Sequence, residues 1–331
     1  MIRRTAVWHA CAVICAVAVI AISTPTPSAA QDITLRLATS VSQGGDVYLL
    51  LENFKQEVET RGGGKIKVNF FFGGTLGNDR QLQEQLLLGT IEAVGLGSTM
   101  VELDPRFGIF DLPFLFNDRD HVYGLLDAEL GGFLTDSLLQ SRNARILAYG
   151  EIGFRQITNN VRPIMRPDDL KDLKMRTPSN KLRIAAFKAL GAAPTAIPYK
   201  ELYTALQQRV VDGQENPLIV IQEKSLWEVQ KYISLTNHVF TPAYLVVNED
   251  WWQGLSDDQR QTIGAAASAA ATWQRNKLAG MDGELMAEAR ANGMQIDTPD
   301  LAPFAKLTGS VWETYESAHG RKLIDLVLKA R

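Results

Sequence analysis

The sequence of 331 residues predicts an α/β protein built as two lobes. Strand-like and helix-like segments alternate from residue 33 to residue 229, which is typical of parallel sheets covered by helices. The chain is also longer than one small core needs, so two lobes are expected. A third observation is a helical pattern after residue 255 that is long enough to connect two lobes.

The first thirty residues have the features of a secretory signal peptide. A short cationic start at 1–4 precedes an almost wholly apolar run at 6–22 and a proline-containing break at 23–27. Residues 28–30 (SAA) match the small-residue pattern that signal peptidase accepts, so we expect cleavage after Ala30. An uncleaved membrane anchor is the alternative, but the apolar run is short for a bilayer span. The residues around the arginine pair do not support the twin-arginine route, which favours general secretion.

Removal of this segment changes the composition of the mature chain. Both cysteines, Cys11 and Cys15, lie in the apolar run, so the mature chain has no disulfide, no lipid-modified cysteine and no thiolate metal site. Without Arg3 and Arg4, the 34 basic side chains become 32 against 37 acidic ones, a formal charge of −5. This balance provides no electrostatic argument for nucleic acid. No other long apolar stretch follows, so we predict a soluble periplasmic protein.

The start of the mature chain has the pattern of a βαβαβ unit, which implies a parallel sheet with covering helices. Leu50, Phe54 and Val58 fall on one helical face, and the glycines at 62–64 end that helix. The predicted elements are a strand at 33–39, a helix from 47 to 58, a strand at 65–72, a helix at 79–88 and a strand at 91–97.

A second set of strands and helices begins near residue 151, and it shows no internal repeat of the first set. Its predicted elements are strands at 154–159 and 173–177, a helix at 181–190, a strand at 195–198, and helices at 201–208 and 218–229.

The C-terminal part is predicted to be mainly helical. Ser256 and Gln259 form a capping box, and the helical pattern that follows continues to about Ala291. At about 1.5 Å per residue this helix would reach roughly 50 Å, unless Gly280 and Gly283 bend it. A final helical stretch is expected at 303–329.

The usual groups for catalysis, metal binding and phosphate binding are missing from the sequence. The mature chain has His121, His238 and His319, which are far apart and lack metal-ligand spacing. It has no GxSxG elbow, no GxxxxGK[ST] loop and no GxGxxG fingerprint. We therefore expect no cofactor, no metal and no enzymatic activity, although the sequence leaves catalytic carboxylates open.

The middle of the chain carries a series of motifs. They are GFRQITN at 153–159, PDDLKDLKMRTP at 167–178, LGAAPT at 190–195, ELYTALQ at 201–207 and VDGQENP at 211–217. In order and spacing, these motifs resemble those of the periplasmic solute-binding subunits of tripartite ATP-independent periplasmic (TRAP) transporters. LGNDR at 76–80 and DLPFLF at 111–116 match the same family. The resemblance covers essentially the whole mature chain.

The resemblance implies a two-lobed periplasmic binding protein of type II-like fold, with lobes joined by crossing strands and a long C-terminal helix spanning both. We place the first lobe at 31–152 plus 242–281 and the second at 153–241 plus 282–331. Family members capture an organic acid between lobes that close in hinge fashion. The implied partners are a small-molecule carboxylate and the membrane permease subunits of a TRAP transporter, which take up the ligand with an ion gradient.

The resemblance also assigns ligand contacts in the second lobe. Arg176 matches the arginine that holds the ligand carboxylate, a role suited to the donor fork of a guanidinium. Asn216 matches an asparagine that hydrogen-bonds the same carboxylate. Arg155 matches a second arginine near the ligand, or is paired with Glu215 in a structural role. Tyr199 stands where many members stack an aromatic ring beside the ligand, with core packing as the alternative.

The first lobe is expected to contribute residues at strand and loop ends, because ligands bind there in open α/β sheets. These candidates are Ser40, Asp79, Ser98 and Thr99, each of which also suits a turn or a helix cap. His238 is a further candidate contact near the hinge, with a place in the core as the alternative.

The candidates in the first lobe favour a sugar acid, such as a uronate, as the ligand. Asp79 would repel a second carboxylate but accept hydrogen bonds from hydroxyl groups. A C4-dicarboxylate is the alternative ligand, and an inward-pointing Arg80 would favour it. A secreted enzyme acting on acidic sugars and a ligand-free sensor or scaffold are the alternative functions.

Overall fold

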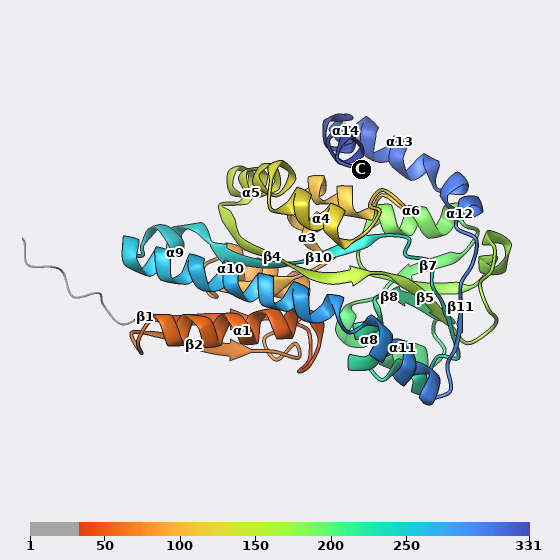
Figure 1. The fold of residues 1–331 in the computed structure, drawn as a ribbon, viewed down its shortest axis with the longest axis horizontal. Helices are drawn as coiled ribbons and strands as arrows, with labels where there is room; N and C mark the ends of the chain where they lie inside the picture. Colours follow the sequence, from red (N-terminus) through yellow and green to blue (C-terminus); the bar gives the residue numbers. More distant parts are fainter. Residues whose placement is uncertain (1–32) are drawn as a thin grey trace, which may run out of the picture.

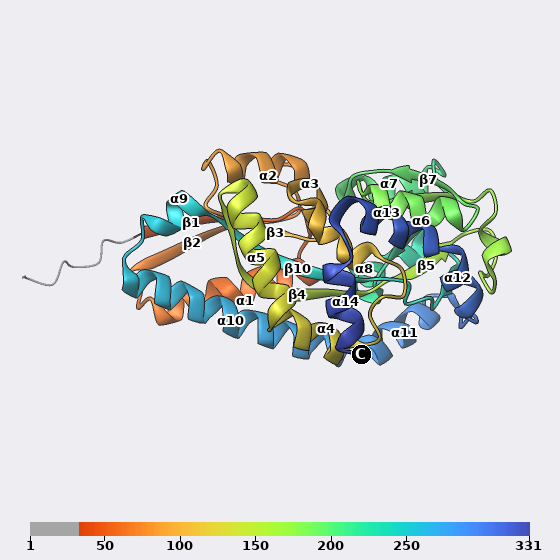
Figure 2. The same cartoon turned by 90° about the horizontal axis from the view of Figure 1, so that it is seen from above.

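The computed structural model describes residues 33–331 and confirms the two-lobed α/β fold (Figure 1). Seen from above, the two lobes lie at opposite ends of the long axis (Figure 2). The predicted signal peptide and its cleavage site lie outside the described residues. Within 33–331, no helix is both long and apolar enough to cross a membrane.

One five-stranded sheet forms the centre of what we call the first lobe. Its strands are β1 (Ile33–Ala38), β2 (Ile66–Phe71), β3 (Ala93–Leu96), β4 (Ala144–Phe154) and β10 (Phe240–Asn248). The strand order is β2-β1-β3-β10-β4. β1 is parallel to β2 and β3, as the βαβαβ pattern predicted, whereas β10 is antiparallel to β3 and β4.

The helices of the first lobe follow the apolar periodicity of the sequence. They are α1 (Asp46–Arg61), α2 (Asp79–Leu87), α3 (Met100–Leu103), η1 (Pro105–Asp111), α4 (Arg119–Leu126), α5 (Glu129–Arg142) and α9 (Glu249–Gln253). α1 buries Leu50, Phe54 and Val58, as predicted. Asn78 caps α2 through a reciprocal capping box with Gln81, which fixes where this helix begins at the cleft.

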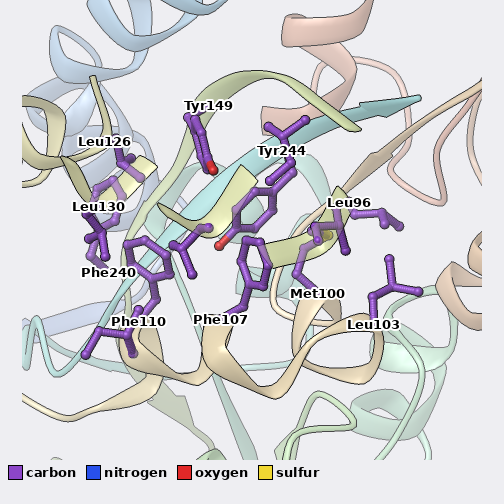
Figure 3. Packing of buried hydrophobic residues seen from close by; sticks show 14 of the residues in the cluster. Leu96, Met100, Leu103, Phe107, Phe110, Leu126, Leu130, Tyr149, Phe240 and Tyr244 are labelled. Atoms are coloured by element: carbon purple, nitrogen blue, oxygen red, sulfur yellow. The ribbon is translucent and has the colours of Figure 1, made fainter. Parts of the chain in front are cut away.

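Aromatic side chains fill the core between the first sheet and the helical layer (Figure 3). Tyr244 of β10 lies edge-on to Phe107 of η1, with ring centroids 5.4 Å apart, and 5.8 Å from Tyr149 of β4. Such edge-to-face aromatic pairs add stability beyond the area that they bury. Because β4 and β10 also lead to the second lobe, this core holds the connecting strands in place.

A six-stranded sheet forms the centre of the second lobe, in the order β11-β9-β5-β8-β6-β7. Its strands are β5 (Gln156–Asn159), β6 (Lys174–Thr177), β7 (Ala193–Ala196), β8 (Gly213–Asn216), β9 (Tyr232–Ser234) and β11 (Gln295–Asp297). β6 is parallel to β7 and β8, whereas β5 is antiparallel to β8 and β9.

One predicted helix of the second lobe is shorter than expected. The helices here are η2 (Pro167–Leu170), α6 (Lys181–Ala189), η3 (Tyr199–Glu201), α7 (Leu202–Gln207), α8 (Leu218–Glu223) and η4 (Leu226–Glu228). The helix predicted at 218–229 stops at Glu223, because Ser225 has a left-handed backbone with a φ of 48°. The apolar pattern continues past this point only because η4 also packs its Leu226 into the core.

Two crossing strands and a helical path connect the lobes. β10 pairs with β4 from Phe240 opposite Phe154 to Asn248 opposite Ala144, so β4 leads from the first sheet to the second lobe and β10 leads back. α10 (Asp257–Ala279) begins at the predicted capping box and packs on α1 and β4. α11 (Asp282–Ala291) follows and packs on α8. The predicted single helix is thus divided at Gly280 (Figure 1).

The last three helices lead from the second lobe back to the first. They are α12 (Ala302–Leu307), α13 (Gly309–His319) and α14 (Lys322–Lys329). Phe304 of α12 packs in the second lobe, whereas Tyr315 of α13 and Ile324 of α14 belong to the core of the first lobe. The Tyr315 hydroxyl also donates to the Arg106 carbonyl at 2.9 Å. We therefore propose that residues 309–329 belong to the first lobe, and the other predicted lobe boundaries stay predictions.

Gln274 of α10 connects three elements near the hinge. Its Nε2 donates to the carbonyls of Glu151, at 2.6 Å, and Asp46, at 3.1 Å, and its Oε1 accepts from the Glu151 N–H at 2.8 Å.

Gln274→Ala should lower the free energy of unfolding by about 1–3 kcal/mol, because it leaves buried backbone groups without partners. Thermal unfolding measures the loss. Gln261→Ala, an exposed position on the same helix, is the control, and equal melting temperatures for the two variants would contradict this role of Gln274.

Candidate functional site

A cavity of about 330 Å³ lies between the lobes and is lined by residues of both. The first lobe contributes the ends of β1 and β3 and the start of α2, and the second contributes the ends of β6, β7 and β8. This is the place where carboxyl ends of parallel strands leave side chains and backbone groups for a ligand. Eight of the nine predicted contacts line the cavity: Ser40, Asp79, Ser98, Thr99, Arg155, Arg176, Tyr199 and Asn216.

Arg176 of β6 is the most deeply buried cation on the cavity wall. Only 2% of its surface is exposed, and its Nε donates to the Ile197 carbonyl at 2.9 Å. No carboxylate of residues 33–331 forms an ion pair with its guanidinium. Burial and the nearby Arg155 lower the pKa of Arg176 to about 10, so the side chain stays charged at neutral pH. The Nη1 and Nη2 groups are therefore free to bind both oxygens of a carboxylate.

Arg155, in contrast, already has a carboxylate partner. Its Nε lies 2.5 Å from Glu215 Oε2. This is the pairing with Glu215 that the sequence left open as the alternative to a ligand contact. Its Nη2 also donates to Asn216 Oδ1 at 2.6 Å. Although burial alone would raise the pKa of Glu215, the guanidiniums of Arg155 and Arg183 hold it well below its ordinary value. Arg155 thus serves to position Asn216 at the cavity.

Asn216 lies at the end of β8 and is held on both sides of its amide. Its Oδ1 accepts from Arg155, and its Nδ2 donates to Gln214 Oε1 at 2.6 Å. An amide nitrogen has two N–H groups, so one of them is left for a ligand on the cavity side.

His238 is the predicted contact that the structure does not bring to the cavity. Its Nε2 lies 3.1 Å from Glu215 Oε2 and its Nδ1 2.8 Å from the Thr236 hydroxyl. Burial lowers the pKa of His238, so the imidazole is neutral at pH 7. Glu215 lies between His238 and Arg155, and His238 therefore belongs to the support behind the cavity wall.

Asp79 is the centre of a hydroxyl cluster on the wall of the first lobe. The Ser40 hydroxyl donates to its Oδ1, and the Thr99 hydroxyl donates to its Oδ2 at 3.1 Å. Burial raises the pKa of Asp79, and these two hydrogen bonds and the charge of Arg176 oppose that shift. Arg80 reaches the cavity rim, but its side chain is 77% exposed and pairs with Glu84 at 3.4 Å.

Tyr199 lies partly buried at the base of the second-lobe wall. Its hydroxyl donates to Glu223, and Lys224 Nζ lies 4.6 Å from its ring centroid. The ring therefore borders the cavity and also packs against α8, so both roles considered for it are compatible with its position.

Sequence reasoning missed Asp46, which also lines the cavity. This residue begins α1 directly after the loop that leaves β1, and only 1% of its surface is exposed. Burial raises the pKa of Asp46 to about 7, opposed by a hydrogen bond from the Val47 N–H. Its position after the carboxyl end of the first strand was the signal that could have identified it.

In residues 33–331, no cluster of three or more His, Cys, Asp or Glu side chains could hold a metal ion. The cavity instead combines a buried guanidinium and an amide on one wall with hydroxyls and carboxyls on the other. Such an arrangement can bind a carboxylate at one end and hydrogen-bonding groups at the other.

Comparisons with known proteins agree with this geometry. The profile of the bacterial extracellular solute-binding proteins of family 7 (DctP) matches residues 37–318. The chain belongs to this family. The expected resemblance to TRAP solute-binding subunits is thereby confirmed.

A curated relative and two solved structures illustrate the similarity. The solute-binding protein is 34% identical over 279 residues to the 2,3-diketo-L-gulonate-binding periplasmic protein YiaO of Escherichia coli, covering 84% of this chain and 85% of YiaO. It resembles the sugar acid binding protein DctPAm of Advenella mimigardefordensis in complex with galactonate, with a TM-score of 0.87, 31% identity and 91% and 98% of the two chains covered. A TRAP periplasmic solute binding protein of Sulfurospirillum deleyianum with bound succinate gives a TM-score of 0.86, 29% identity and 91% and 100% coverage.

The raised pKa of Asp46 predicts a pH-dependent stability. Between the ordinary carboxyl pKa of 3.8 and about 7, the folded state binds more protons at Asp46 than the unfolded state does. The contribution of Asp46 to the stability of the folded state therefore falls as the pH rises through this range. Asp46→Asn should raise the free energy of unfolding at pH 8, and this gain should shrink by up to about 1.4 kcal/mol per pH unit toward pH 4. Urea unfolding at several pH values measures it, and a gain that is the same at pH 8 and pH 4 would contradict the assignment.

Proposed function

We propose that this solute-binding protein captures a hydroxylated monocarboxylate, such as a uronate or another sugar acid, between its lobes. It then delivers the ligand to the permease subunits of a TRAP transporter. The observation that carries the proposal is Arg176, a buried guanidinium at the cavity without a carboxylate partner in the described chain. A buried unpaired charge is costly, and a ligand carboxylate that pairs with it offsets that cost.

The opposite wall supports a ligand with hydroxyl groups over one with a second carboxylate. It carries Asp46 and Asp79, together with the hydroxyls of Ser40 and Thr99. Carboxyl oxygens accept hydrogen bonds from hydroxyls and repel another carboxylate. Arg80, the cation that the first lobe contributes to the cavity lining, is solvent-exposed at the rim and engaged with Glu84.

The relatives support the same ligand class and also its alternative. YiaO is named for binding 2,3-diketo-L-gulonate, and DctPAm was solved with galactonate. A C4-dicarboxylate remains the second candidate, because a structure of similar fold contains succinate. The two acidic side chains opposite Arg176 favour the sugar acid for this chain.

We also propose that the protein is not an enzyme. The family consists of solute-binding proteins, and two acidic groups of the cavity, Asp46 and Asp79, are engaged in hydrogen bonds with backbone or with neighbouring hydroxyls. Mass spectrometry of uronates, aldonates and C4-dicarboxylates incubated with the purified protein should detect no product. Turnover of any of these acids would show instead a secreted enzyme acting on acidic sugars.

Substitution of Arg176 tests the binding function. Arg176→Ala should weaken binding of a sugar acid by roughly 30-fold to several thousand-fold, because truncating one side of a buried charge pair costs about 2–5 kcal/mol. Arg176→Lys should restore little, since an ammonium lacks the planar fork. Asn216→Ala should cost about 1–3 kcal/mol. Calorimetric titration with galactonate, glucuronate and succinate measures each affinity.

A control separates lost binding from lost folding. Circular dichroism of each variant must match that of the wild type, and Arg166→Ala, an exposed arginine outside the cavity, should bind normally. Near-wild-type affinity of folded Arg176→Ala would mean that the carboxylate is held elsewhere, with Arg155 the next candidate.

Export is the remaining part of the proposal. We expect the mature protein to begin near Gln31 and to be released by osmotic shock. N-terminal sequencing of the released protein checks this. Recovery only with membranes, with residues 1–30 still attached, would show that the apolar run is an anchor.

A further inference from the structure

Asp46 has a carboxyl group that the fold buries without a side-chain partner. Its Oδ1 accepts from the N–H of the next residue, Val47, at 2.5 Å. Nowhere in residues 33–331 does a side chain donate a hydrogen bond to this carboxyl. It lines the cavity between the lobes, so its remaining acceptor sites are available to a molecule inside it.

The surrounding structure holds this carboxyl in a fixed place. The backbone carbonyl of Asp46 accepts a hydrogen bond from Gln274 Nε2 at 3.1 Å. α1, the helix that begins at Asp46, packs its apolar face into the core. The preceding loop touches the second lobe, where the Ser42 N–H donates to Glu223 at 3.2 Å and Lys224 donates to the Ser42 hydroxyl at 3.1 Å. The loop therefore presents the Asp46 carboxyl to the cavity from a rigid frame.

The charged groups nearest to Asp46 are already engaged with other partners. Lys224 lies 3.0 Å from Glu223, which also accepts from the Tyr199 hydroxyl. Arg155 pairs with Glu215. None of these cations bonds to Asp46 in the described chain, so a ligand group is the partner that its position leaves open.

We infer that Asp46 is a specificity-determining residue, which accepts a hydrogen bond from a ligand hydroxyl and disfavours a ligand with a second carboxylate. The inference rests on the proposed function, in which Arg176 holds the first carboxylate at the other wall. Like-charge contacts inside a buried site are a common way to reject a competing ligand. Asp79 differs from Asp46 in this respect, because two protein hydroxyls already donate to it.

Two pairs of ligands isolate the effect of the second carboxylate. D-Galactonate and D-galactarate, and likewise D-gluconate and D-glucarate, share their open carbon chains, and in each pair only the second has two carboxylates. Wild-type protein at pH 8 should bind the monocarboxylate of a pair at least roughly 30-fold more tightly. Asp46→Asn should reduce this ratio at least about fivefold, because it removes the repulsion. Asp46→Ala should weaken binding of the monocarboxylate at least about tenfold, since it also removes the acceptor.

Asp257→Asn is the matched control, because Asp257 is also the first residue of a long helix but its side chain is 95% exposed. This variant should keep the wild-type ratio, and a fall equal to that of Asp46→Asn would overturn the inference as a general charge effect. Circular dichroism checks folding, and calorimetry measures the affinities. If the wild type binds a monocarboxylate and both Asp46 variants keep its ratio and affinity, the inference fails while the proposed function stands. If the wild type binds neither monocarboxylate, or binds the dicarboxylates more tightly, the proposed ligand class fails and the inference with it.

Discussion

The buried carboxylate of Glu215 is shared between two guanidiniums, and this sharing shapes the binding wall of the second lobe. Arg155 and Arg183 both pair with Glu215, and Arg183 also pairs with Asp111 from the first lobe. These two cations are balanced by two carboxylates. Arg176 remains as a buried positive charge with no such partner in the described chain. Because an isolated charge in the interior is costly, the wall is prepared for an anion before any ligand arrives.

The elements that connect the lobes also support the cavity. Ile152 of β4 lines it, and the backbone N–H and carbonyl of the preceding residue, Glu151, are hydrogen-bonded to Gln274. α10 and the strands β4 and β10 carry the chain from one lobe to the other. We propose that a hinge motion of the lobes, as the family resemblance implies, changes the distance between Arg176 and the first-lobe wall.

The two walls differ in chemical character, and this difference orients a ligand. The second lobe presents guanidinium and amide donors, whereas the first presents carboxyl and hydroxyl groups around Asp79 and Asp46. The fold alone decides neither feature, since one fold can carry many ligand preferences. In the proposed function, Arg176 binds the carboxylate that all candidate ligands share, and the first-lobe side chains determine the selectivity among these acids.

The sequence by itself determined the local elements and the residue types of the site. Apolar spacing predicted α1, the capping box at Ser256 started α10 where expected, and the motif containing Arg176 identified the guanidinium at the cavity. These features depend on residues close together in the chain, whose backbone preferences and motif spacing are readable without the fold. Strand ends also predicted Asp79 and Ser40, because the carboxyl ends of parallel strands share one edge.

Only the tertiary structure decided which partners those residues have. Glu215 is 60 residues from Arg155 in sequence, yet the two side chains form an ion pair, so Arg155 is not free to bind a ligand carboxylate as Arg176 is. His238 contacts the same Glu215 carboxylate and therefore lies behind the cavity wall. Asp46 came to the cavity because α1 docks with its first residue beside Gln274, 228 residues away. Contacts between distant segments depend on how the lobes, sheets and helices pack together, and the periodicity of a single segment does not predict that packing.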